Sequence, residues 1–327
     1  MYINEKRHKS QCKFLRSTDK TFWRDTTSKM TGNKNNNFFN SQKPKSFPLT
    51  LALVAIIFFF ILNFTHTQPT IPILGFHGII DSKNTTLQSY QGEMDYPKQD
   101  LEKLLEYFIL HDYWFLTSQD LYDYFLKKSQ HIPDNNRNKT PIMISFDDGY
   151  KTVYTILLPI LSKLEKKYGI KVKVVLFINP GTLAKSNSKD VTHLGCRELR
   201  EGLRRGFYDI QSHGLNHKDL TKLPRYQLVN EILQARIELR KCTQDLDPEQ
   251  KVASHLAYPY GAYNKQVERY VSKYYLSSYL YNNEILNYGC LKNFYKIPRL
   301  MINRKKTTNA LIEVGKGWYP LNNNEKC

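Results

Sequence analysis

Residues 141–149 read Pro-Ile-Met-Ile-Ser-Phe-Asp-Asp-Gly, an apolar run that ends in two adjacent carboxylates and a glycine. A near-continuous apolar run of this length is typical of a strand that is buried on both faces of a parallel sheet. Parallel strands need crossover connections, which are usually helices. This stretch therefore predicts an α/β fold in which Asp147 and Asp148 lie at the carboxyl end of a central strand.

The segments around this strand alternate as an α/β fold requires. Strands are predicted at 71–76, 114–116, 171–178, 207–211, 255–258 and 274–281, and helices at 96–111, 118–128, 153–168, 198–205, 224–241 and 265–273. Strands that alternate with helices indicate βα units and a mostly parallel sheet or barrel. No internal repeat and no second linker divides residues 70–320, so one domain is expected there.

A second apolar stretch, at residues 49–64, precedes this domain. Residues 49–62 (LTLALVAIIFFFIL) hold one threonine and no charge, a length between a signal-peptide core and a full membrane span. The preceding segment is far longer than a signal-peptide n-region, and no small-x-small cleavage pattern follows. We therefore predict an uncleaved transmembrane anchor at 49–64. A cleaved signal and a buried core helix are the alternatives.

The net charge of +18 is densest at the amino terminus. Residues 1–48 carry 11 Lys and Arg against 3 Asp and Glu, and they are rich in Asn, Ser and Thr, as disordered tails are. The positive-inside rule keeps this tail in the cytoplasm and exports residues 65–327. Topology thus explains the charge, and the exported part holds no long basic block. A nucleic-acid-binding or membrane-surface protein is therefore the last-ranked function class.

Cysteine usage agrees with export. Five cysteines in 327 residues exclude a small disulfide-stabilised scaffold. Cys12 falls in the tail, whereas Cys196, Cys242, Cys290 and Cys327 fall in the exported part, where disulfides can form. Four cysteines allow three full pairings, and the sequence does not choose among them.

Polar residues follow three of the predicted strands. Besides 145–149 (SFDDG), they form the stretches 212–217 (SHGLNH) and 257–261 (AYPYG). Functional residues of α/β barrels gather at the carboxyl ends of the strands. The three clusters are therefore expected to converge in one cleft, although they are far apart in the sequence.

One aspartate, together with His213 and His217, forms a ligand set suited to a catalytic metal. The histidines are four residues apart, which can place both rings on one face of a turn. Two histidines and a carboxylate with open positions suit Zn²⁺ or another divalent metal, which acidifies water and polarises a carbonyl. The other aspartate can serve as the base. Either motif alone would more often be a turn or a solvated pair.

In this order and combination the three motifs resemble those of the polysaccharide deacetylases with a NodB-homology domain, over residues 73–303. The resemblance implies a distorted, incomplete (β/α) barrel that removes acetyl groups from a polysaccharide. It implies that Asp147 is the catalytic base and that the metal is held by Asp148, His213 and His217. Zn²⁺ is the favoured metal, with Co²⁺ and Ni²⁺ as alternatives.

A missing histidine points to one branch of this family. Many members carry a general-acid histidine near the C-terminus, but no histidine follows His255 here. The circularly permuted branch, similar to the poly-β-1,6-N-acetylglucosamine deacetylases, has this histidine near the start of the domain. Residues 73–79 (ILGFHGI) resemble that strand. The resemblance makes His77 the general-acid candidate, and His255 a weaker rival.

An arginine is displaced in the same way. The common pattern has arginine before its Pro-Tyr, whereas this chain has Ala257-Tyr258, and residues 296–300 (KIPRL) match a late Pro-Arg segment of the permuted branch. Arg299 is thus expected to orient and ionise Asp147 through paired hydrogen bonds. The turn at 258–261 is expected to present the Tyr260 backbone N–H to the oxyanion.

The sequence therefore predicts a membrane-anchored, metal-dependent N-deacetylase of an extracytoplasmic polysaccharide, with a poly-β-1,6-N-acetylglucosamine-like substrate favoured. The resemblance implies a bacterial inner membrane, with the domain facing the periplasm or the exterior. A sugar O-acetyl esterase or a peptidoglycan deacetylase would use the same residues. A catalytically silent glycan-binding module is a further alternative, disfavoured because the base and all three ligands are present. His193 and Cys196 form a His-x-x-Cys pair that we interpret as structural.

Overall fold

The computed structural model describes residues 69–81, 92–185 and 192–317. All of these residues belong to the compact unit Thr65–Cys327. The predicted tail (1–48) and the predicted anchor (49–64) lie outside the described residues. Within the described ranges, no helix is both long enough and apolar enough to cross a membrane.

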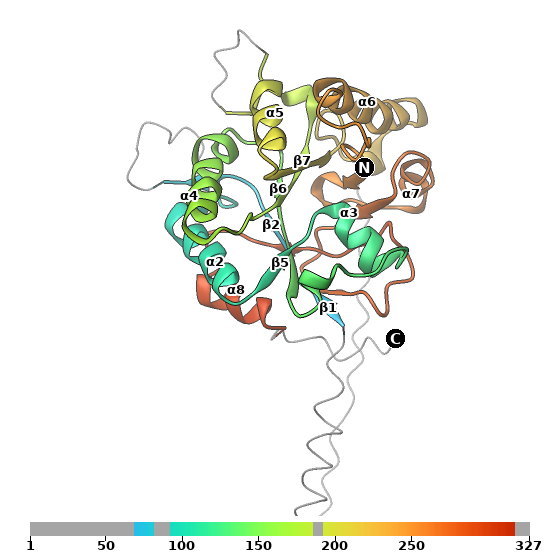
Figure 1. Ribbon diagram of the computed structural model, residues 1–327. Coiled ribbons are helices and arrows are strands. Elements are labelled where there is room, and N and C mark those ends of the chain that lie inside the picture. Colours follow the sequence, from blue (N-terminus) through green and yellow to red (C-terminus); the bar gives the residue numbers. More distant parts are fainter. Residues whose placement is uncertain (1–68, 82–91, 186–191, 318–327) are drawn as a thin grey trace, which may run out of the picture. The chain divides into compact units, whose positions relative to one another are not determined.

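A curved parallel sheet lies at the centre of this unit (Figure 1). In the described part of the chain, its strands are ordered β10-β9-β8-β7-β6-β2-β12, and β5 pairs with the beginning of β6. A single bridge between Tyr279 and Ile297 links β10 to the segment before β12, so the two edges of the sheet approach each other there. This is the incomplete barrel of parallel strands that the family resemblance implies. The strands are β2 (Ile73–Phe76), β5 (Tyr113–Phe115), β6 (Thr140–Asp147), β7 (Val174–Ile178), β8 (Tyr208–Ser212), β9 (His255–Ala257), β10 (Ser277–Tyr279) and β12 (Leu300–Met301).

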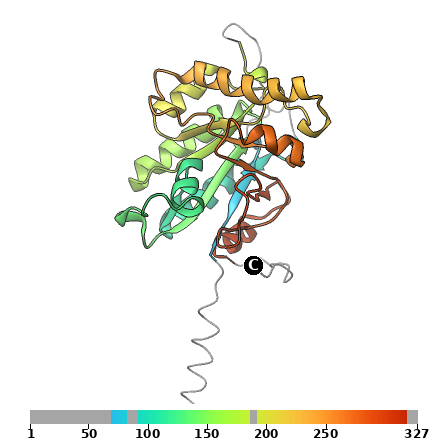
Figure 2. The ribbon, with the colours of Figure 1, turned by 90° about the vertical axis from the view of Figure 1, so that its right-hand side faces the viewer.

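Helices surround the sheet on its outer face. Neighbouring helices contact each other in the order α8, α2, α4, α5, α6 and α7, with a π-helical turn before α4 meeting α5. Figure 1 shows this arrangement, and Figure 2 shows α6 and α7 next to each other from the side. The helices are α2 (Lys98–Leu110), α3 (Ser118–Asp120), α4 (Leu158–Tyr168), α5 (Cys196–Arg204), α6 (Arg225–Thr243), α7 (Lys265–Val271) and α8 (Thr308–Gly315).

Short elements correct several predicted boundaries. The predicted helix at 96–111 begins later, because β4 (Tyr96–Pro97) pairs with β3 (Ile79–Ile80). The predicted helix at 118–128 is α3 followed by a π-helical stretch, Leu121–Leu126. The predicted strand at 274–281 is reduced to β10, since the N–H groups of Tyr274 and Tyr275 both bond to the Val271 carbonyl at the end of α7. Three elements were not predicted from the sequence: β12, α8, and β11 (Leu286–Asn287), which pairs with β1 (Thr70–Ile71).

The side chains of β6 alternate between two layers. Ile142, Ile144 and Phe146 join the core between the sheet and the helices, whereas Met143 joins a smaller core in the barrel interior. Because successive side chains of a strand point to opposite faces, the residues that share the face of Met143 are Ser145 and Asp147. The interior is therefore apolar near the amino end of β6 and polar at its carboxyl end, where function is expected.

A disulfide joins two of the surrounding helices. Cys196, the first residue of α5, is bonded to Cys242 in the last turn of α6. This bond selects one pairing from the three that the sequence allows and confirms a structural role for Cys196, while Cys327 lies outside the described residues. It closes a loop of 46 residues. In the chain-entropy description, a loop of this size stabilises the fold by about 4 kcal/mol.

Replacing Cys196 and Cys242 together with serine is expected to lower the free energy of unfolding by about 2–4 kcal/mol, because the unfolded chain regains freedom. Urea denaturation of the full chain under oxidising conditions measures this loss as a lower midpoint. The control is Cys12→Ser, in the predicted tail, which is expected to leave the midpoint unchanged. Equal midpoints for the double variant and the wild type would contradict the prediction.

Candidate active site

The curvature of the sheet brings the predicted residues together. His77 directly follows β2, Asp147 ends β6, and His213 directly follows β8. In the sheet, β2 and β6 are neighbours, whereas β7 separates β6 from β8. Two strand spacings separate the backbones of His213 and Asp147 by roughly 10 Å. Their side chains both point into the interior and meet there, with His213 Nε2 3.8 Å from Asp147 Oδ2.

Asp147 is held by Arg299 in a paired hydrogen bond. Arg299 Nη1 donates to Oδ1 at 2.7 Å, and Nη2 donates to Oδ2 at 2.8 Å. Both side chains are buried, Arg299 completely and Asp147 to within 2%. Burial, the largest single effect, would raise the pKa of Asp147, but the charge and hydrogen bonds of Arg299, together with His213 and His77, outweigh burial and lower the pKa to about 2. The pairing that the sequence predicts is therefore present, and Asp147 is ionised at neutral pH.

Further contacts hold Arg299 in place. Its Nε donates to the Leu280 carbonyl at 2.9 Å, and its Nη1 also donates to Ser145 Oγ at 3.2 Å. The aromatic rings of Phe177 and Tyr281 lie 4.8 and 4.9 Å from its guanidinium carbon. Rings at this distance attract a cation, and they also shield the pair from water. The orientation of Arg299 is thus set by the whole barrel interior.

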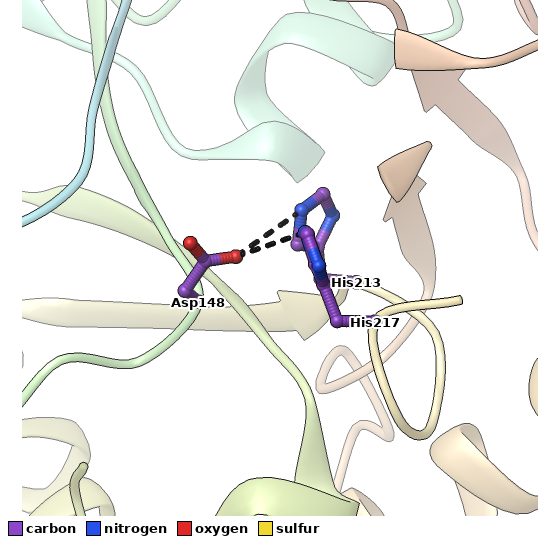
Figure 3. Close-up of side chains that lie close together, drawn as sticks. All are labelled: Asp148, His213 and His217. Carbon is purple, nitrogen blue, oxygen red and sulfur yellow. Dashed lines mark ion pairs between the residues drawn. The ribbon is translucent and has the colours of Figure 1, made fainter. Parts of the chain in front are cut away.

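Asp148 faces the two predicted histidine ligands (Figure 3). Its Oδ1 lies 3.3 Å from His217 Nε2 and 3.6 Å from His213 Nε2. Asp148 and His217 both adopt left-handed backbone angles, with φ of 68° and 54°. This strained conformation, uncommon outside glycine, is often retained at functional sites. Here it turns Asp148 away from the strand alternation and toward the histidines.

The protonation of the two histidines suits metal ligands. His213 Nδ1 lies 2.8 Å from the Ala257 carbonyl, which can only accept, so Nδ1 carries the proton and Nε2 is free to bind. Burial lowers the pKa of His213 to about 3, and it also lowers the pKa of His217. Both rings are therefore neutral at pH 7, so each has one nitrogen lone pair to offer to an ion, and in His213 this lone pair is on Nε2.

Two residues that the sequence analysis missed hold the loop after β8. Asn179 Nδ2 donates to the carbonyls of His213 and Gly214. Glu231 of α6 accepts from the N–H groups of Leu215 and Asn216, at 3.1 and 2.8 Å. A signal for Glu231 was available, because it lies on the buried face of its helix, where a carboxylate needs partners.

These residues fit a divalent cation. One ligand atom each from Asp148, His213 and His217 lies within 4.8 Å of the other two. Asp148 Oδ1 is buried and has no hydrogen-bond partner, although an unpaired buried oxygen is costly. Burial, helped by the adjacent Asp147 charge, raises the pKa of Asp148 to about 6. A cation would compensate this buried charge, and two imidazoles with a carboxylate are ligands that Zn²⁺ prefers.

His77 lies on the other side of Asp148. Its Nε2 is 3.9 Å from Asp148 Oδ2, and its Nδ1 is 3.4 Å from the hydroxyl of Tyr281. The structure therefore brings His77 to the site. His255, the weaker rival, is at the start of β9, buried, and hydrogen-bonded to Ser277 and Gln119, so it is not part of the site.

Tyr260 lies in the tight turn after β9, Pro259–Gly261, with φ of 60°. Its ring is 68% exposed and packs against the ring of His217 at a centroid distance of 4.5 Å. The third cluster thus reaches the site as predicted. The exposed tyrosine ring is a feature that the sequence did not reveal.

Residues 134–278 match the sequence family described as polysaccharide deacetylase. The poly-β-1,6-N-acetyl-D-glucosamine N-deacetylase of Staphylococcus aureus (strain MRSA252) is 27% identical over 208 residues, covering 63% of this chain and 67% of the relative. A polysaccharide deacetylase from Bacillus cereus shares the fold with a TM-score of 0.61 at 22% identity, covering 75% of this chain and 69% of that one. The Streptococcus pyogenes deacetylase PplD, solved in complex with acetate, gives a TM-score of 0.58 at 20% identity, covering 76% and 98%.

Residues 134–278 thus form a polysaccharide deacetylase domain, and the similarity identifies a hydrolase that acts on amide bonds. The family match includes the Asp147–Asp148 pair, both candidate histidine ligands and Tyr260. The family match does not extend to His77 or Arg299. Their assignment to the site therefore rests on their distances to Asp148 and Asp147.

Asp147→Asn is expected to lower the free energy of unfolding by about 3–5 kcal/mol, because Arg299 then lies buried without a counter-charge. Chemical denaturation of the metal-free protein measures this loss. The variant retains Asp148 and both histidines, so added Zn²⁺ is still expected to stabilise it. A variant as stable as the wild type would show that the buried pair is dispensable to the fold.

Asp148→Asn, one residue away, is expected to have a different effect on the stability of the metal-free protein from that of Asp147→Asn. Without metal it should be at least as stable as the wild type, because the substitution removes a buried charge and asparagine tolerates left-handed φ. Thermal unfolding with and without Zn²⁺ tests this pair of expectations. A ligand at about 1,000 times its Kd stabilises a protein by about 4 kcal/mol, and the variant should lose most of that gain. Equal stabilisation of wild type and variant by Zn²⁺ would exclude Asp148 as a ligand.

Proposed function

We propose that this polysaccharide deacetylase is a metal-dependent N-deacetylase of an extracytoplasmic N-acetylated polysaccharide, with a poly-β-1,6-N-acetylglucosamine-like polymer as the favoured substrate. The observation that carries the proposal is that a candidate base and a candidate acid flank one ligand set. Asp147 Oδ2 lies 3.8 Å from His213 Nε2, and His77 Nε2 lies 3.9 Å from Asp148 Oδ2. Amide hydrolysis needs both groups, one to deprotonate water and one to protonate the leaving amine.

Asp147 is the base in this mechanism. Each of its oxygens accepts one bond from Arg299, but a carboxylate oxygen has a second lone pair, so Oδ2 can still accept a proton from water. Arg299 holds the carboxylate in one orientation throughout. A base with a pKa of about 2 is weak by itself, so the attacking water must be acidified.

The metal site would supply that acidification. Asp148, His213 and His217 would hold the cation, Zn²⁺ by preference and Co²⁺ or Ni²⁺ as alternatives. When bound, a divalent cation acidifies water and polarises the acetyl carbonyl. The Tyr260 backbone N–H, in the turn after β9, would donate to the oxygen on which negative charge develops.

His77 would protonate the departing nitrogen. An amine is a poor leaving group unless it gains a proton, so an acid opposite the base favours amide substrates. An O-acetyl esterase or a peptidoglycan deacetylase would use the same groups, and only a comparison of substrates separates these reactions. The exposed ring of Tyr260 offers an apolar face to a sugar beside the ligands.

Two observations support the proposed substrate and location. The Staphylococcus aureus relative is named for poly-β-1,6-N-acetyl-D-glucosamine. The Cys196–Cys242 disulfide suits an oxidising compartment, in agreement with a domain exported from a cytoplasmic tail. We therefore propose a single-pass bacterial inner-membrane protein, anchored by residues 49–64, with residues 65–327 in the periplasm or outside the cell.

Acetate release from poly-β-1,6-N-acetylglucosamine oligomers tests the proposal. The purified full chain is expected to release acetate, to stop when a chelator removes metal, and to resume when Zn²⁺ or Co²⁺ is restored. His77→Gln is expected to lower kcat by roughly 10²–10⁴-fold, the usual contribution of a general acid. His131→Gln changes an exposed histidine in the loop before β6 and serves as the matched control.

The substrate panel also includes peptidoglycan and O-acetylated sugars. Release from these but not from the oligomers would replace the favoured substrate and keep the reaction class. Metal binding without acetate release from any substrate would instead indicate a glycan-binding module.

A further inference from the structure

Tyr281 contacts both Arg299, which holds the proposed base, and His77, the proposed acid. Its ring lies 4.9 Å from the guanidinium carbon of Arg299, which holds Asp147. Its hydroxyl donates to the Gly75 carbonyl at 2.7 Å and lies 3.4 Å from Nδ1 of His77. One side chain after β10 therefore joins the proposed base to the proposed acid.

The hydrogen bonds of this hydroxyl determine where the proton of His77 resides. A tyrosine hydroxyl has one proton, and a carbonyl oxygen can only accept, so the Tyr281 proton points to Gly75. Toward His77 the hydroxyl oxygen can then only accept. The contact at 3.4 Å is a hydrogen bond only when the neutral His77 ring carries its proton on Nδ1, which leaves Nε2 bare. On further protonation, the new N–H forms at Nε2, the atom that faces Asp148.

The approach of Tyr281 depends on the residue opposite it. A Cβ added to Gly75 would lie 2.5 Å from Cε2 of Tyr281, closer than two carbons can approach. The same glycine carbonyl also accepts from the Ile302 N–H at 2.9 Å, which ties it to the segment after β12. Gly75 in β2 thus leaves room for the tyrosine ring, and its carbonyl accepts the hydrogen bond from the tyrosine hydroxyl.

We infer that Tyr281 is a positioning residue for His77: its hydroxyl oxygen accepts from Nδ1 and thereby directs Nε2 toward the reacting amide. The kinetic consequence rests on the proposed function, in which His77 is the general acid. The tautomer of His77 does not depend on the proposed function. Tyr281 touches no reacting atom, so its loss should reduce the rate of the chemical step and leave substrate and metal binding unchanged.

The tautomer is measured directly by long-range ¹H–¹⁵N spectra of the full chain, labelled at histidine, without metal and at a pH where the ring is neutral. The His77 signals are assigned by their loss in His77→Gln. The expected result is a protonated Nδ1 in the wild type and a shift toward a protonated Nε2 in Tyr281→Phe. A wild type that is protonated at Nε2 would overturn the inference, whatever the variants do.

Kinetics provide the second readout, on zinc-loaded full-length protein. Tyr281→Phe keeps the ring over Arg299 and is expected to lower kcat about tenfold, part of the roughly 10²–10⁴-fold that acid–base catalysis contributes. KM and zinc content should stay within twofold of the wild type. The control is Tyr279→Phe, two residues earlier in β10, which removes another fully buried tyrosine hydroxyl. It should change neither kcat nor the His77 tautomer.

The outcomes separate this inference from the proposed function. No acetate release by the wild type on any substrate would reject the function, yet the spectra would still decide the role of Tyr281. Full kcat and an unchanged tautomer in Tyr281→Phe would reject the inference, even in an active deacetylase. Equal losses in both tyrosine variants would indicate a packing effect, which also overturns it.

Discussion

The buried ion pair between Arg299 and Asp147 is the contact on which the site depends. A charge removed from water costs several kcal/mol unless it is paired, so neither residue is tolerable here without the other. Arg299 precedes β12 at the edge of the sheet, whereas Asp147 ends β6, with β2 between them. The pair therefore ties the edge of the barrel to its centre. It also sets the ionised state and the orientation of the carboxylate that we propose as the base.

One backbone turn gives two adjacent aspartates contrary environments. Asp147 follows the strand alternation into the interior and meets a cation that lowers its pKa to about 2. Asp148 leaves the strand at a φ of 68°, meets two neutral imidazoles, and has a pKa raised to about 6 by burial. The first environment retains a charge for proton transfer. The second environment leaves Asp148 Oδ1 without a hydrogen-bond partner, as a cation ligand requires. Asn179 and Glu231 hold the loop after β8, which keeps His213 and His217 close to that oxygen.

The parts of this arrangement that follow from local sequence were predictable. The apolar run before Asp147 predicts a buried strand, and β6 extends over it. The pairing of Arg299 with Asp147, expected from a family resemblance, is present in the structure. The catalytic roles of these residues remain predictions. Tyr281 was missed as a site residue, because a tyrosine after a short strand carries no local signal, and the residues that its hydroxyl contacts, Gly75 and His77, are about 200 positions away in the chain.

The sequence by itself determined that the polar clusters at 145–149, 212–217 and 257–261 lie at the ends of strands, because an apolar run is a local property of the chain. It also determined that two histidines four residues apart share one loop. Only the tertiary structure decided that His77, Asp148 and His213 meet, and that Tyr281 lies between His77 and Arg299. These contacts depend on strand order and sheet curvature, which arise from packing the whole core. No stretch of the chain short enough to be read as a pattern contains that information.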